Sequence, residues 1–174
     1  MKWIIALAYL ATVPIANWLI GYVGTECIPN GPCLIPVGFG LMAPSGVLMI
    51  GAALVLRDAI QATLGARWTL AAIACGIVLS ALVSPPALVL ASAVAFGLAE
   101  LADMAVYTPL RKAGRIVLAV LISGVIGSAV DSAAFLWLAF GSLDFIAGQI
   151  VGKMWMTIVA AGALFIYPAT HQGG

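Results

Sequence analysis

The sequence predicts an all-α integral membrane protein with six transmembrane helices in one bundle. Of the 174 residues, 64% are hydrophobic and only 7% are charged, whereas an ordinary soluble domain carries about a quarter charged residues. The apolar residues fall into six long runs, each near the roughly 20 residues that cross a bilayer core about 30 Å thick. Lys and Arg residues gather in alternate connections between these runs.

The predicted spans are, in chain order, residues 3–23, 37–56, 68–84, 87–107, 116–139 and 146–167. The first run begins like a signal peptide, but no small-x-small cleavage site follows, so we expect a retained helix. Pro44-Ser45-Gly46 interrupts the second, which is expected to be a straight helix or one that begins broken or re-entrant. Ser84-Pro85-Pro86 predicts a tight turn after the short third span. A five-helix arrangement that merges or loses one of these two segments is the alternative.

The basic residues predict the orientation of the spans, because Lys and Arg are retained on the cytoplasmic side. The first, third and fifth connections contain no Lys or Arg. The basic residues lie at the amino terminus and in the second and fourth connections: Lys2, Arg57, Arg67, Arg111, Lys112 and Arg115. The pattern predicts that both termini are cytoplasmic. Because the sequence contains no internal repeat, low-complexity stretch or linker, we expect residues 1–174 to form a single transmembrane domain.

The three cysteines fall into two groups. Cys27 and Cys33 flank a short Pro- and Gly-containing turn in the first connection. A disulfide there requires an oxidising compartment, and two free thiols are the alternative. Cys75 stands in an apolar run, where we expect it to pack as a small hydrophobic residue.

Polar side chains inside the predicted spans are the strongest functional signal. A charge at the bilayer centre costs at least about 2.5–3.5 kcal/mol, so such residues face the bundle interior and mark binding sites or relays. The sequence therefore predicts seven substrate-binding candidates: Asn17, Asp58, Glu100, Asp103, Asp131, Gln149 and Lys153.

Helix geometry predicts how these candidates gather. At a rise of 1.5 Å per residue, Asp131 and Lys153 both lie roughly 10–13 Å below the fifth connection and can meet as an ion pair. Asn17 reaches a similar level, and Gln149 lies one turn from Lys153 on the same face. The alternatives are a structural ion pair that only fixes helix register and an Asn17 that only hydrogen-bonds between helices.

A second group lies nearer the cytoplasmic half. Glu100 and Asp103 are three residues apart, which places both carboxyl groups on one helix face, near the level from which Asp58 and Arg57 could approach. The alternative to a binding role for Asp58 is that it is only an interfacial residue beside Arg57. If Glu100, Asp103, Asp131 and Lys153 are all ionised, their charges sum to −2. A proton, a neighbouring Arg or a ligand rich in hydrogen-bond donors must then complete the site.

Several other function classes are not expected. A net charge of +1 offers no basic surface for nucleic acid. The single His, His171, falls in the polar tail, so a Ser-His pair or a His-metal site cannot be built within the bundle. We therefore expect no catalytic residues, no metal and no cofactor.

Five segments in order resemble the queuosine-precursor transporter family, also described as vitamin uptake transporters of the VUT type. They are ANWLI around Asn17, RDAIQATLG from Arg57 to Gly65, AFGLAELADMAVYTPLRK around Glu100 and Asp103, GSAVDSAAFLWLAFG around Asp131, and GQIVGKM around Lys153. One position departs from the pattern. Glu100 stands where the family more often carries Gln.

The resemblance implies a six-helix inner-membrane protein that imports 7-cyano- or 7-aminomethyl-7-deazaguanine, the precursors of the modified tRNA nucleoside queuosine. A guanine-like base offers adjacent N1–H and amine donors to a carboxylate and a carbonyl to Lys153 or Gln149. Asp103 is the favoured carboxylate, because it fits the family's aspartate. The alternative function is a substrate-binding subunit that needs an ATPase partner, since six helices are few for alternating access by a monomer. The working unit, monomer or homodimer, is left open.

Overall fold

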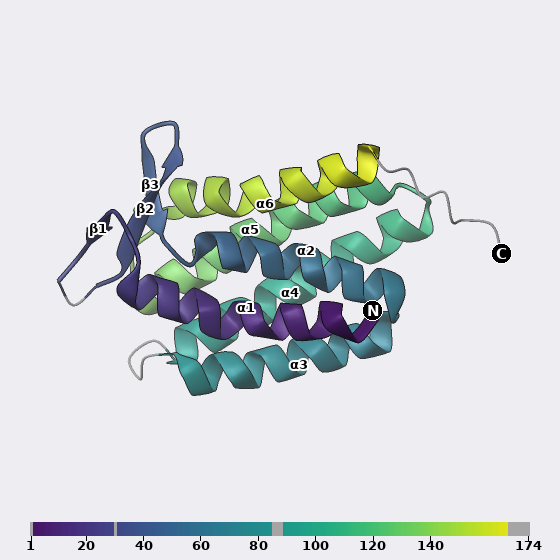
Figure 1. The fold of residues 1–174 in the computed structure, drawn as a ribbon, viewed down its shortest axis with the longest axis horizontal. Helices are drawn as coiled ribbons and strands as arrows, with labels where there is room; N and C mark the ends of the chain where they lie inside the picture. Colours follow the sequence, from purple (N-terminus) through teal and green to yellow (C-terminus); the bar gives the residue numbers. More distant parts are fainter. Residues whose placement is uncertain (1, 30, 85–88, 167–174) are drawn as a thin grey trace.

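The computed structural model describes residues 2–29, 31–84 and 89–166. Within these ranges, six helices run back and forth along one direction (Figure 1). They are α1 (Lys2–Tyr22), α2 (Val47–Thr63), α3 (Ala66–Val83), α4 (Val89–Lys112), α5 (Ile116–Phe140) and α6 (Ile146–Ile166). Five of the six follow the predicted spans closely, with α4 continuing five residues past its predicted end at 107.

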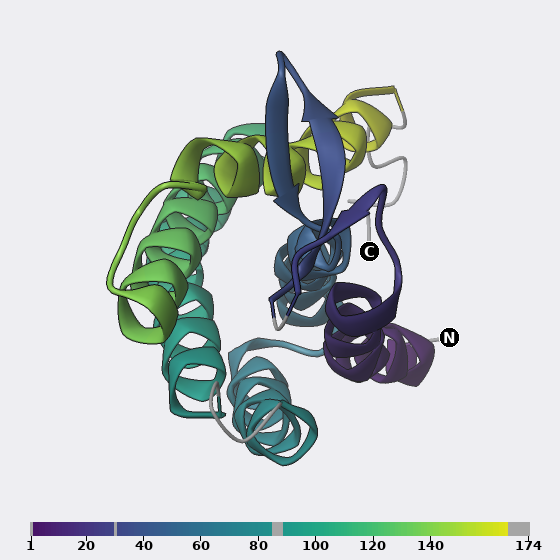
Figure 2. The same ribbon diagram turned by 90° about the vertical axis from the view of Figure 1, so that its left-hand side faces the viewer.

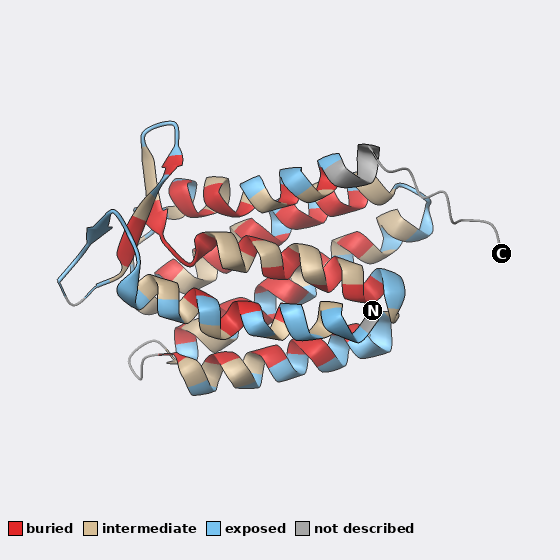
Figure 3. Cartoon of the chain, viewed as in Figure 1, coloured by how far each residue is buried: buried red, intermediate tan, exposed pale blue. Residues whose placement is uncertain are grey.

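The membrane character of the helices follows from their length and composition. Among the described residues, α1, α3, α4 and α5 are long and apolar enough to cross a membrane. The apolar part of α6, Ile146–Gly162, is shorter, and α2 has only 17 residues, two of them Arg57 and Asp58. Large apolar residues such as Leu7, Leu82 and Leu90 are exposed, as expected of helices solvated by lipid. Figure 3 shows exposed and buried positions alternating along the helices. The chain is therefore a multi-pass membrane protein.

The prediction for the second span is wrong at its start. Residues 37–46 are not helical, and α2 begins at Val47. The segment between α1 and α2 forms an antiparallel sheet of β1 (Glu26–Cys27), β2 (Cys33–Gly38) and β3 (Leu41–Pro44). Gly38, Phe39 and Gly40 all have positive φ, and such a glycine-rich turn favours a hairpin over a helix. The fold is therefore helical with a small added sheet.

The hairpin of β2 and β3 is attached to the helices at the end of the bundle nearest β1. The Trp155 indole donates to the Val37 carbonyl at 2.8 Å, and the Ser45 hydroxyl donates to the Leu19 carbonyl at 2.7 Å. A Cβ on Gly148 would lie 2.1 Å from the Met42 carbonyl oxygen, so only glycine permits this close packing of α6 against β3. We call this end of the molecule the hairpin end (Figure 2).

The opposite end carries the turns from α2 to α3 and from α4 to α5 (Figure 1). We call it the basic end, because Arg67, Arg111, Lys112 and Arg115 lie in or beside these turns. The hairpin end carries the exposed acidic residues Glu26 and Asp144. The prediction that Arg57 also lies in a connection is wrong, because the later start of α2 moves Arg57 into the helix.

Helix α2 lies at the centre of the bundle (Figure 2) and contacts each of the other five helices. Its residues Ala53 and Ile60 pack with Tyr9, Ala72 and Phe96 in one apolar cluster. A Cβ on Gly51 would lie 2.7 Å from the backbone oxygen of Lys153, so the glycine lets α2 and α6 approach closely. The central helix thereby brings its polar residues against both α4 and α6.

Candidate functional site

A cavity of about 480 Å³ opens between the helices in the half of the bundle nearest the hairpin. Most of its lining is apolar and comes from α1, α2, α4 and α5, including Val13, Ala53 and Phe96. Gly31, Pro32 and Pro44 line it from the segment between α1 and α2. A cavity of this size that is mostly apolar, with a few polar groups, has the usual character of a small-molecule site.

Three of the seven predicted residues line the cavity, namely Asn17, Asp131 and Gln149. Asp58, Glu100, Asp103 and Lys153 are buried but are not among its lining residues. The polar lining also includes Thr12, Ser80 and Ser92, which the sequence did not mark. Small hydroxyl residues in apolar helices are common, and nothing in their sequence context distinguishes these three.

The predicted ion pair between Asp131 and Lys153 is present at one side of the cavity. The Lys153 ammonium donates to Asp131 Oδ2 at 2.5 Å, Ser132 Oγ at 2.7 Å and Gln149 Oε1 at 3.1 Å. These three acceptors match the three donors of an ammonium group. We call these four residues the Lys153 cluster. Lys153 is fully buried and is not among the lining residues of the cavity. Its hydrogen bonds fix the orientation of Asp131 and Gln149, which do line the cavity.

Asn17 stands on α1 at the cavity wall, half-buried. Its amide nitrogen donates to the Val13 carbonyl at 3.0 Å, and its oxygen accepts from the Ser84 hydroxyl at 3.4 Å. Asn17 therefore links α1 to the end of α3, as the structural alternative supposed, while it also borders the cavity. It is not part of the Lys153 cluster.

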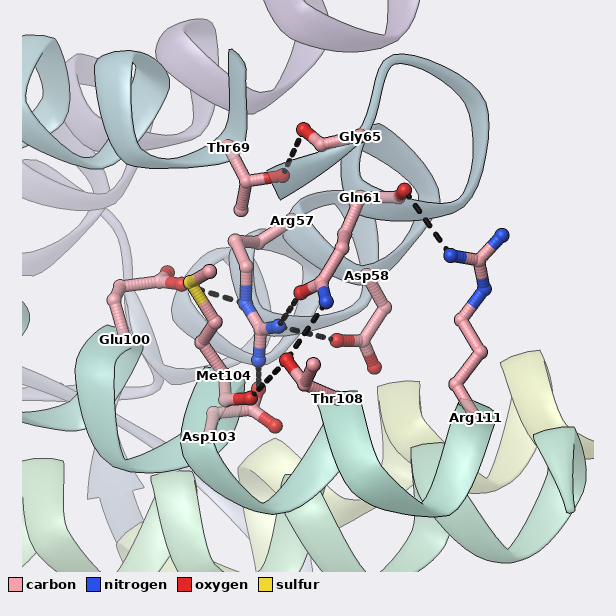
Figure 4. A network of polar contacts seen from close by, with 10 residues as sticks. All are labelled: Arg57, Asp58, Gln61, Gly65, Thr69, Glu100, Asp103, Met104, Thr108 and Arg111. Atoms are coloured by element: carbon pink, nitrogen blue, oxygen red, sulfur yellow. Dashed lines mark hydrogen bonds and ion pairs between the residues drawn. The ribbon is translucent and has the colours of Figure 1, made fainter. Parts of the chain in front are cut away.

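A second polar cluster surrounds Arg57 on α2 (Figure 4). The guanidinium contacts Asp103 Oδ2 at 2.6 Å, Asp58 Oδ1 at 2.9 Å and Glu100 Oε2 at 3.3 Å. It also donates to Gln61 Oε1 at 3.2 Å and lies 5.5 Å from the centre of the Tyr107 ring. Arg57, Glu100 and Asp103 are almost completely buried. We call Arg57, Asp58, Glu100 and Asp103 the Arg57 cluster.

The predicted approach of Asp58 and Arg57 to Glu100 and Asp103 is confirmed by these contacts, but Arg57 was not among the predicted site residues. Arg57 was interpreted as a cytoplasmic loop residue because the apolar run was taken to start at residue 37. The glycines and prolines around the hairpin are the signal that indicates a later helix start. A helix beginning at Gly46 or Val47 places Arg57 about ten residues inside.

A side-chain network continues from Arg57 toward the basic end (Figure 4). Gln61 accepts from Arg57 and donates to the Thr108 hydroxyl at 2.8 Å. Arg111 donates to the backbone carbonyls of Gln61 and Ala62 at 3.4 and 3.0 Å. This network joins the ends of α2 and α4, and the sequence did not mark Gln61 or Thr108.

The two clusters differ in their charge. Asp131 and Lys153 balance each other. One Arg with three carboxylates carries a charge of −2 if every group is ionised, and a buried site tolerates such an excess poorly. Among the described residues, no three His, Cys, Asp or Glu side chains are arranged to hold a metal ion.

The cysteines complete the description of the hairpin end. Cys27 and Cys33 form a disulfide between β1 and β2, in agreement with the first of the two alternatives. It closes the segment that carries Gly31 and Pro32 to the mouth of the cavity. Cys75 is a free thiol on the exposed face of α3, so it does not pack into the core as expected.

Comparison with known proteins gives one match. Residues 81–168 match a family described as "Putative vitamin uptake transporter". This range includes all of α4, α5 and α6, and therefore Glu100, Asp103, Asp131 and Lys153. No curated protein and no solved structure matches the chain. A multi-pass helical bundle with a small-molecule cavity agrees with a transport function, and the chain belongs to the vitamin uptake transporter family.

Proposed function

We propose that this protein imports queuosine precursors across the cell inner membrane and binds the 7-deazaguanine base in the cavity near the hairpin end. The observation that carries the proposal is the polar lining of that cavity. Asp131, Gln149 and Asn17 supply acceptors and donors on an otherwise mostly apolar wall, in a chain that belongs to a vitamin uptake family. A flat heterocycle with polar edges fits such a wall.

Asp131 is the proposed acceptor for the N1–H and exocyclic amine of the base. Its Oδ2 is held by Lys153, and a carboxylate retains enough lone pairs to accept two further hydrogen bonds. Asp103 is less suited to this role, because it contacts Arg57 and does not line the cavity. The proposal therefore assigns to Asp131 the role that the family pattern first suggested for Asp103.

Gln149 and Phe96 are proposed to complete recognition of the base. The Gln149 oxygen accepts from Lys153 at 3.1 Å, which orients the amide nitrogen as a donor for the carbonyl of the base. The Phe96 ring lines the cavity and offers an apolar surface to a planar ligand. The Lys153 cluster has no excess charge, which favours a ligand that is neutral in this region.

The experiment is a binding measurement with purified protein and three bases: 7-cyano-7-deazaguanine, 7-aminomethyl-7-deazaguanine and guanine. We expect a 7-deazaguanine to bind more tightly than guanine, and Asp131→Asn to weaken binding. Asp144→Asn is the matched control, because Asp144 is an exposed carboxylate outside the cavity. Equal binding of all three bases, or no binding at all, would overturn the substrate assignment.

The proposed topology has six spans, with the basic end in the cytoplasm, because Arg67, Arg111, Lys112 and Arg115 gather there. The disulfide supports this orientation, since disulfides persist on the oxidising side of the membrane. After mild reduction of intact cells, an impermeant thiol reagent should label Cys27 and Cys33 from outside. Labelling of these cysteines only from the cytoplasmic side would reverse the orientation.

A further inference from the structure

The Arg57 cluster lies one helical turn below the cavity. Three residues that line the cavity are each four positions along a helix from Tyr9 or from a member of the Arg57 cluster. On α1 Tyr9 lies four residues from Val13, on α2 Arg57 lies four residues from Ala53, and on α4 Glu100 lies four residues from Phe96. Four residues of helix rise about 6 Å. All three steps run toward the basic end, so the two sites are stacked along the bundle.

The layer between the two sites is apolar. Val13, Ala53 and Phe96 belong to one core cluster with Tyr9, and the Tyr9 and Phe96 rings lie 6.1 Å apart. A ligand in the cavity therefore rests on side chains that pack in one cluster with Tyr9, and Tyr9 lies near Glu100. Occupancy of the cavity and the state of the lower site can influence each other through this layer.

The Arg57 cluster has unused hydrogen-bonding capacity. The Tyr9 hydroxyl lies near Glu100, and the Ser123 hydroxyl lies near Asp58 and Asp103. Both hydroxyls are completely buried, and neither forms a hydrogen bond of good geometry with the described residues. The Asp103 oxygens also lack one, although Arg57 neutralises part of their charge. Most buried polar groups in proteins are hydrogen-bonded, and each exception calls for an explanation, such as an ordered water, a bound ion or a functional role.

We propose that the Arg57 cluster is a proton-binding site separate from the cavity, and that Glu100 takes up and releases one proton for each base carried inward. The proposal rests on the transport function proposed above. The proton adds to a Glu100 carboxylate oxygen from the hairpin side and leaves that oxygen toward the basic end. No covalent bond of the base changes.

Glu100 is the member of the cluster best placed to exchange a proton. Its contact with Arg57, at 3.3 Å, is longer than those of Asp58 and Asp103, at 2.9 and 2.6 Å. One guanidinium cannot neutralise three carboxylates, so the carboxylate held least closely is the one that accepts a proton at lowest cost. Glu100 is also the carboxylate beneath Phe96, at the boundary with the cavity.

The charged and titratable groups around Glu100 come from several elements. They are Tyr9 on α1, Arg57 and Asp58 on α2, Asp103 on α4, and Asp131 on α5, which is itself paired with Lys153 on α6. Arg57 contacts all three carboxylates of the cluster, and its positive charge disfavours a metal cation beside it.

The test uses purified protein in liposomes, with radiolabelled 7-cyano-7-deazaguanine as the probe. For one proton per base, an inward pH gradient of one unit should support about tenfold accumulation, and a protonophore should abolish it. Glu100→Gln should bind the base and exchange labelled for unlabelled base, yet concentrate none. Asp144→Asn, an exposed carboxylate removed elsewhere, should accumulate the base like the wild type.

Several results would overturn the proposal. One is full accumulation of the base by Glu100→Gln, and another is accumulation that follows a sodium gradient instead of the pH gradient. The third is loss of base binding in Glu100→Gln, which would place Glu100 in the binding site. If wild-type protein does not bind the base, the proposed function fails first. If Glu100→Gln aggregates, wild-type liposomes decide: addition of the base should make a weakly buffered medium more alkaline, and no change would contradict proton coupling.

Discussion

The Lys153 cluster and the Arg57 cluster each place one buried cation among acidic side chains, but only the first borders the cavity. In the Lys153 cluster one ammonium meets one carboxylate and two neutral acceptors. In the Arg57 cluster one guanidinium meets three carboxylates and Gln61. A balanced cluster can present a fixed carboxylate to a ligand, whereas a cluster with excess negative charge depends on something that neutralises it.

The difference also shows how each cation is used. Lys153 has three hydrogen-bond donors and all three are used, so its role is to hold Asp131 in place. Arg57 has five donors in a planar fork and lies on α2, the helix that contacts all the others. Its removal would affect the packing of α2 against α4, while removal of Lys153 would affect mainly the pairing of α5 and α6.

The largest expected effect is on stability, from substitution of the two cations. Arg57→Met leaves three buried carboxylates with no cation, and loss of one partner from a single buried pair already costs about 3–5 kcal/mol. Lys153→Met leaves only Asp131 without its cation, so we expect a smaller loss. The measurement is the yield of monodisperse protein in detergent together with its thermal unfolding temperature. A greater loss in Lys153→Met would invert the comparison.

The next largest expected effect is on the affinity for the base, and it separates a binding role from a structural one. Asp131→Asn replaces an acceptor oxygen with a donor that opposes the donors of the base, at about 1–3 kcal/mol per mispaired group, or roughly ten- to hundred-fold in affinity. Asp103→Asn should change affinity less, because Asp103 does not line the cavity. Titration of the purified variants with 7-cyano-7-deazaguanine checks this order, and a greater loss in Asp103→Asn would place the binding site at the Arg57 cluster.

Exchanging the charges of Asp131 and Lys153 tests whether this ion pair binds the base or only stabilises the fold. The double variant Asp131→Lys with Lys153→Asp keeps a buried ion pair, so we expect it to recover much of the yield lost in either single variant. It also places an ammonium where the cavity now has a carboxylate, so base binding should stay lost. Recovery of binding together with yield would make the pair a structural one, without a role in recognition.

The smallest expected effect lies in the network toward the basic end. Thr108→Val removes the acceptor of the Gln61 amide, and a neutral hydrogen bond contributes about 1 kcal/mol. Thr63→Val is the matched control, because the Thr63 hydroxyl donates only to backbone carbonyls of its own helix. A small drop in unfolding temperature for Thr108→Val beyond that of Thr63→Val is expected. Equal temperatures would remove this hydrogen bond from the coupling between α2 and α4.

Composition and periodicity were sufficient to predict much of this protein. The apolar runs predicted five of the six helices to within a few residues at nearly every boundary, because lipid requires long helices that satisfy their own backbone. Fixed helical spacing predicted that Glu100 and Asp103 share a face, and matched depth predicted the contact of Asp131 with Lys153. These predictions held because they depend on local geometry and on the cost of burying an unpaired charge.

Only the tertiary structure decided which polar residues meet the cavity. Turn chemistry between residues 37 and 46 outweighed hydrophobicity, and this moved Arg57 from an expected loop into the centre of the bundle. The close approach at Gly51 and the stacking of the cavity over the Arg57 cluster depend on contacts between helices distant in the sequence. Hydropathy reports which residues avoid water, but the packing of neighbouring helices determines which buried polar groups face each other and which face a ligand.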